Sequence, residues 1–76
     1  MNKARRKEIE EIIEELNSLK ERIESVQSEE QDCFDNMPEN LQSSERGEQA
    51  EEAVGYLDDA LSYLDDAIDS MQEAMQ

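Results

Sequence analysis

The sequence contains no histidine or tryptophan and has only one cysteine, one proline and two glycines in 76 residues. The single cysteine, Cys33, cannot form a disulfide within the chain, and without histidine there is no credible zinc or iron–sulfur site. A chain of this length is only marginally stable without disulfides or a metal. Oligomerisation is therefore the remaining source of stability that we expect.

Long hydrophobic runs are also missing. The first residues are basic but lack the apolar stretch of a signal peptide, and no run approaches the ~20 apolar residues that span a bilayer. We expect a cytoplasmic protein that has no membrane contact and no cofactor. We also expect no enzymatic activity, because histidine is absent and the carboxylates stand in exposed rows, whereas general acid–base catalysis needs a carboxyl that is buried or has a close charged neighbour.

Positive charge is almost absent after the first helix. Residues 1–22 carry six cations and six acids, whereas residues 23–76 carry sixteen acids and one cation, Arg46. The whole net charge of −15 therefore belongs to the second segment. Such a field repels nucleic acid and attracts basic surfaces, so we expect a basic protein partner and no direct nucleic-acid binding.

A seven-residue phrase organises the C-terminal half of the chain. Residues 54–74 read VGYLDDA, LSYLDDA and IDSMQEA in succession. A strict period of seven predicts a helix in left-handed superhelical packing, which we expect to run from about 45 to 75 after a cap at Ser43 or Ser44. Its apolar face is broad, since it includes columns of leucine, alanine and tyrosine.

The N-terminal half predicts a second helix, from about residue 2 to 35, with Asn2 as its cap. A narrow apolar seam is expected along it, broken only by Glu30, and Phe34 is expected to widen the seam near the corner. The seam consists of positions 9, 12, 16, 19, 23, 26, 30, 33 and 37. The basic residues at positions 3–7 are expected to neutralise acids near Asp69 and Glu73.

Residues 36–44 predict a structured corner between the two helices. Pro38 disfavours a continuing helix, while Asn36 and Glu39 predict a short turn that Asn36 caps. Two helices of similar length joined by a corner predict an all-α antiparallel hairpin in a single domain, 1–76. The broad face of the second helix exceeds what the narrow seam can cover. We therefore expect a homodimer that forms a four-helix bundle, or else a monomer whose spare face binds another protein.

Two groups of residues are candidate sites. The first is a pair of acid rows opposite the packing face, made of Glu51, Glu52, Asp58, Asp59, Asp65, Asp66 and Glu73. The rows are either a solvated surface or a ladder of carboxylates that imitates nucleic-acid phosphates; they diverge along a rod, so no metal site is expected. The second is a possible pocket near the corner, made of Phe34, Asn36, Pro38, Glu39, Arg46, Tyr56 and Tyr63.

The corner also carries a family resemblance. Residues 29–53 read EEQDCFDNMPENLQSSERGEQAEEA. This stretch resembles small uncharacterised acidic helical proteins of phages, prophages and mobile elements of Gram-positive bacteria. The resemblance implies a phage context and assigns no activity.

Together these observations predict a non-enzymatic protein-binding module. One form of the hypothesis is a phage-encoded inhibitor that engages a host defence or nucleic-acid-handling protein through its acidic helix face. The alternatives are a helical oligomer that binds a small molecule such as a nucleotide, and a structural bundle within a phage assembly.

Overall fold

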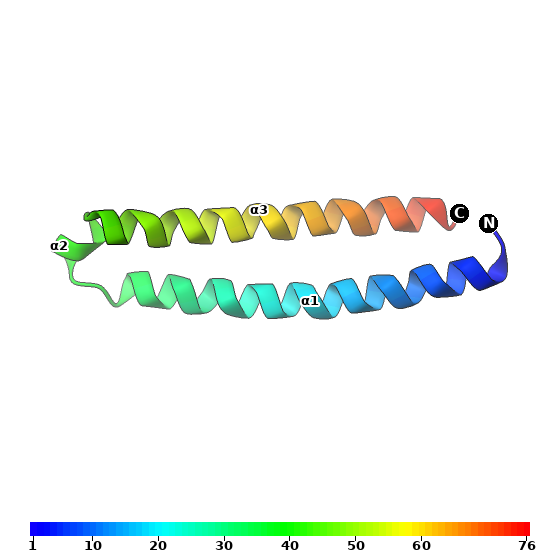
Figure 1. The fold of residues 1–76 in the computed structure, drawn as a ribbon, viewed down its shortest axis with the longest axis horizontal. Coiled ribbons are helices and arrows are strands. Elements are labelled where there is room, and N and C mark those ends of the chain that lie inside the picture. Colours follow the sequence, from blue (N-terminus) through cyan, green and yellow to red (C-terminus); the bar gives the residue numbers. More distant parts are fainter.

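The chain is a two-helix hairpin with a short helix in its corner, described over all 76 residues by a computed structural model (Figure 1). Helix α1 spans Lys3–Asp35, α2 spans Glu39–Gln42 and α3 spans Glu45–Ala74. The long helices α1 and α3 run antiparallel, and the two termini meet at the end opposite the corner. The predicted helical hairpin is confirmed. No helix is long and apolar enough to cross a membrane.

Helix α1 begins as predicted. The side-chain oxygen of Asn2 accepts a hydrogen bond from the backbone N–H of Arg5 at 2.8 Å, and Asn2 itself has extended backbone geometry. This contact satisfies one of the N–H groups that the first turn of a helix leaves without a partner. Asn2 is therefore the N-cap of α1.

The prediction that Asn36 caps the short turn in the corner is wrong. Asn36 ends α1 instead of starting the next turn, and its backbone N–H donates to the carbonyl of Asp32 at 3.0 Å. Pro38 is the last extended residue before α2, and its carbonyl accepts from Leu41 at 2.8 Å. Because the proline ring has no hydrogen-bond acceptor, α2 starts without a side-chain cap.

Ser44 takes the predicted N-cap position before α3, but its hydroxyl bonds to α2 instead of capping α3. The backbone of Ser44 is extended, as an N-cap requires, yet its side chain accepts no hydrogen bond from α3. The hydroxyl donates to the carbonyl of Leu41, while that of Ser43 donates to Glu39 at 3.1 Å. Both serines therefore satisfy carbonyl groups of α2.

Two contacts hold the corner against the helices. The Gln42 side chain donates to the carbonyl of Phe34 at 3.1 Å, which ties α2 to the end of α1. Gly47 is buried in the first turn of α3, where the backbone of Leu41 and Gln42 lies against it. Residue 47 has no room for a side chain, so α2 packs directly on the α3 backbone.

Helix α1 meets α3 through a face that is rotated from the predicted seam. The residues that turn toward α3 are Ile9, Ile13, Leu16, Lys20, Ile23, Gln27, Glu30 and Phe34, all buried or half-buried. The predicted seam residues Ile12, Leu19, Val26 and Cys33 are exposed instead, so this part of the prediction is wrong.

Two polar contacts accompany the rotation. With α1 turned this way, the Gln27 side chain donates to the Val54 carbonyl at 3.1 Å, and Lys20 forms an ion pair with Asp65. Seam packing at positions 19 and 26 would turn Lys20 and Gln27 away from α3. Ile13 and Phe34 supply apolar contacts at the two ends of the rotated face.

The core of the hairpin is small. Only Ile13, Gly47, Ala50 and Ile68 are buried. The rod measures 58 × 15 × 11 Å between its outermost Cα atoms, so each helix has solvent on most sides. A large part of the apolar surface therefore remains uncovered.

Candidate functional site

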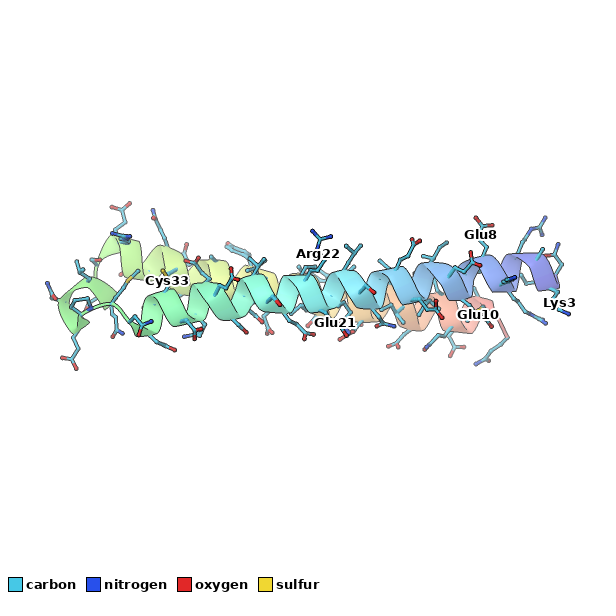
Figure 2. All side chains as sticks on the ribbon, turned by 90° about the horizontal axis from the view of Figure 1, so that it is seen from below. Lys3, Glu8, Glu10, Glu21, Arg22 and Cys33 are labelled. Atoms are coloured by element: carbon cyan, nitrogen blue, oxygen red, sulfur yellow. The ribbon has the colours of Figure 1, made fainter.

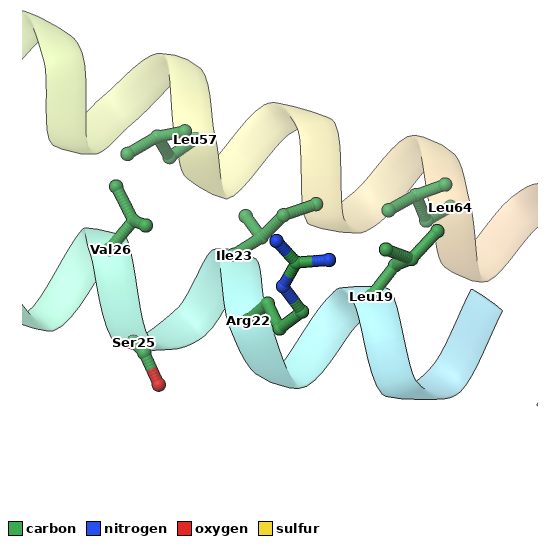
Figure 3. A pocket seen from close by; sticks show the side chains of 7 residues that line it. All are labelled: Leu19, Arg22, Ile23, Ser25, Val26, Leu57 and Leu64. Carbon is green, nitrogen blue, oxygen red and sulfur yellow. The ribbon is translucent and has the colours of Figure 1, made fainter. Parts of the chain in front are cut away.

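An apolar groove runs between α1 and α3 near the middle of the hairpin (Figure 3). Leu19, Ile23 and Val26 of α1 form one wall, and Leu57 and Leu64 of α3 form the other. Arg22 and Ser25 lie at its rim, and the hollow has a volume of about 630 Å³. No acid lines this groove, although the chain carries 22 of them.

The groove exists because of the rotation of α1. Leu19 and Val26 keep 44% and 54% of their surface exposed, since the turn of α1 toward positions 20 and 27 leaves them outside the contact. Ile12 and Cys33 continue the same column at intervals of seven and are also exposed. In the sequence this column is the part of the predicted seam at positions 12, 19, 26 and 33, which the prediction placed against α3.

The surface of α3 beside the groove is also apolar. At 100° per residue, the column of alanines at positions 53, 60 and 67 lies beside the leucines on the helix surface, and the tyrosine column lies beside the alanines, farther from the leucines. Tyr56 and Tyr63 are 72% and 70% exposed, more than expected for residues at the edge of a core. Helix α3 therefore offers an uncovered apolar face that continues the groove wall.

The predicted acid rows lie away from the groove. All seven of their residues are exposed, as the heptad positions indicated. Asp65 is the only one with a cation within 4 Å, the ammonium group of Lys20. The hydrogen bond to Asp65 raises the pKa of Lys20, and the charges of Asp65 and neighbouring acids add to it, while desolvation opposes it. The other six carboxylates make no ion pair.

The basic residues at positions 3–7 lie at the same end of the hairpin as Asp69 and Glu73 but form no ion pair with them (Figure 1). Lys20–Asp65 is the only ion pair in the hairpin, so the cations of the first turns have no acid within 4 Å. Figure 2 shows the outer charges of α1 divided between two edges, with Arg22 and Glu8 on one and Glu21 and Glu10 on the other. Arg22, which lies at the rim of the groove, therefore shares its edge of α1 with Glu8.

The corner residues do not gather into a cavity. Phe34 is half-buried, while Asn36, Pro38, Glu39 and Arg46 are exposed. The two hollows of the hairpin are the groove and a polar depression beside it on α1, and neither includes a corner residue or a tyrosine. No cluster of carboxylates or cysteine has the arrangement of a metal site.

Comparison with known proteins adds no assignment. No protein family, curated protein or solved structure matches this chain.

Proposed function

We propose that this chain is a non-enzymatic protein-binding module that works as a homodimer and binds a basic-surfaced protein through the acid rows of α3. The observation that carries this proposal is that six of the seven row carboxylates are exposed and unpaired on one continuous helix. Like charges on one helix face destabilise it, so their concentration there favours a use in binding. A basic surface would supply the missing cations.

The rows have a geometry suited to an extended basic groove. Equivalent acids recur every seven residues, which is about 10 Å along the helix axis. A rigid ladder of this kind imitates the regular negative charge of a nucleic-acid backbone. The resemblance of residues 29–53 to small phage proteins supports a host target in the cytoplasm, such as a defence or nucleic-acid-handling protein that the module inhibits.

A charge-matched pair of variants tests the acid rows. The test variant changes Asp58, Asp59 and Asp66 to Asn; Asp65 is kept because it pairs with Lys20. The control changes Glu10, Glu21 and Glu24 of α1 to Gln, which removes the same charge from other exposed positions. Immobilised wild type, test and control proteins are compared for capture from a bacterial lysate, and circular dichroism checks their helix content.

We expect the wild type and the control to capture a basic protein and the test variant to lose it. Retention of that protein by the test variant would refute binding through the acid rows. Equal loss from both variants would show that net charge alone is responsible, and would refute the proposal in the same way.

A further inference from the structure

We infer that the apolar groove is the surface on which a second copy of this chain docks, so that two hairpins form a four-helix bundle with the acid rows on its outside. This inference rests on the proposed homodimer and adds the surface that forms it. The occupant of the groove is another hairpin, packed along its whole length.

The exposed area of the single hairpin is consistent in size with such a partner. Its accessible surface is 5785 Å². A compact monomer of this mass exposes about 4,800 Å², so the hairpin has about 1,000 Å² in excess. A stable interface of ordinary size covers about 800 Å² on each partner. One docked copy would therefore cover about as much surface as the hairpin exposes beyond a compact monomer.

The spacing of the open residues favours a helical rod of the same kind. On α1 the exposed apolar residues Ile12, Leu19 and Val26 recur every seven residues. On α3 the leucines and alanines beside the groove recur at the same interval. Side chains with this period interlock along their length with helices of the same superhelical twist. A second hairpin provides two such helices.

Charge also restricts which face of the hairpin can self-associate. With a net charge of −15 on each copy, two chains repel strongly wherever their acids meet. The groove itself is lined without acids and has Arg22 at its rim, while three glutamates line the depression that shares Leu19 and Arg22 with it. Docking through it keeps the row acids of the two copies on opposite outer sides, where their repulsion is weakest. The alanine column allows the close approach that such packing requires.

A substitution in the groove tests this surface. Val26→Glu places a charge at a side chain that is more than half exposed in the single hairpin, so the fold should tolerate it. The matched control is Ser62→Glu, an exposed site about 150° around α3 from the leucines of the groove. Sedimentation equilibrium over a micromolar concentration series measures the dimer dissociation constant, and circular dichroism measures helix content.

We expect the wild type and Ser62→Glu to be dimers, and Val26→Glu to dimerise about 100-fold more weakly, because each dimer loses two apolar contacts and buries two charges. If Val26→Glu fails to fold, Val26→Gln removes the apolar contact without adding charge and should weaken the dimer in the same direction.

Two results would overturn the inference: one refutes the homodimer, and the other refutes only the groove as its surface. A monomeric wild type throughout the series would refute the homodimer itself. A dimeric wild type whose dissociation constant is unchanged by Val26→Glu or Val26→Gln would refute the groove as its surface and leave the homodimer standing. Neither result affects the capture experiment on the acid rows.

Discussion

The two glycines of α3 give a sharp test of how the corner is built. Both lie within the helix and have a negative φ, so the backbone conformation at neither position requires a glycine. A Cβ atom at residue 47 would lie 2.6 Å from the carbonyl oxygen of Leu41 and 2.5 Å from the carbonyl carbon of Gln42, and closer still to its oxygen. A Cβ atom at Gly55 would meet nothing within 4 Å.

The two alanine variants should therefore change stability in opposite directions. Unstrained contacts between carbon atoms lie near 3.5–4.0 Å, so at residue 47 α2 would have to move by roughly 1 Å. We expect Gly47→Ala to lower the free energy of unfolding by about 1–3 kcal/mol, as overpacking does. Gly55→Ala should raise it by about 0.5–1 kcal/mol, since alanine is the better helix former and has free space there.

Urea unfolding followed by far-UV circular dichroism, at one protein concentration, measures both changes. Each variant adds one methyl group to a glycine of the same helix, so the gain in helix propensity is shared and the difference reports the corner contact. A Gly47→Ala protein as stable as the wild type would refute the close packing of α2 on α3. A destabilised Gly55→Ala protein would show that another backbone lies against residue 55.

Three further predictions concern polar contacts. The pKa of Lys20 is raised by its hydrogen bond to Asp65, so the ion pair stabilises the hairpin at neutral pH and up to the ordinary value of 10.5, and this contribution is lost as pH rises through the raised pKa. Lys20→Met should therefore lower the urea midpoint at neutral pH, and the difference from the wild type should shrink as the pH is raised above 10.5. Gln42→Ala removes the half-buried hydrogen bond to the Phe34 carbonyl and should cost about 1 kcal/mol in urea unfolding, with no loss in the control Gln49→Ala at an exposed site of α3. Asn2→Ala removes the cap of α1 and should cost about 0.5–1 kcal/mol, measured as faster amide hydrogen exchange in the first turn, whereas Asn2→Asp should preserve the protection.

The helices, the corner and the exposure of the acid rows followed from local features of the sequence. A strict heptad period marks both the extent of α3 and the side on which its acids lie, and Pro38 with the residues around it interrupts the helical pattern. These signals act within a few residues of one another. They do not depend on how the two helices are paired.

The rotation of α1 could not be predicted in the same way. This helix has two apolar stripes, one through Ile12, Leu19 and Val26 and the other through Ile13 and Phe34. Counting apolar residues favours the first stripe, and we predicted that it faces α3. In the structure the second stripe faces α3, and in that orientation Lys20 and Gln27 find partners on Asp65 and Val54, residues that are distant in the sequence. The groove is a direct result of that choice.

The charges at positions 3–7 show a similar limit. Placing cations and acids at one end of the hairpin predicted neutralisation, but an ion pair requires the side chains to reach one another. In the structure only Lys20 makes such a contact. Knowing which charged residues lie at the same end of the hairpin therefore does not determine which of them form ion pairs.

The separation of the apolar groove from the acid rows makes ionic strength a selective variable. Added salt screens the repulsion between two chains of charge −15, and sulfate strengthens apolar contact, so self-association through the groove should tighten. The same salt weakens the attraction between the acid rows and a basic surface. Raising the salt concentration should thus release a bound basic partner while holding the two hairpins together, which separates the two kinds of contact without any mutation.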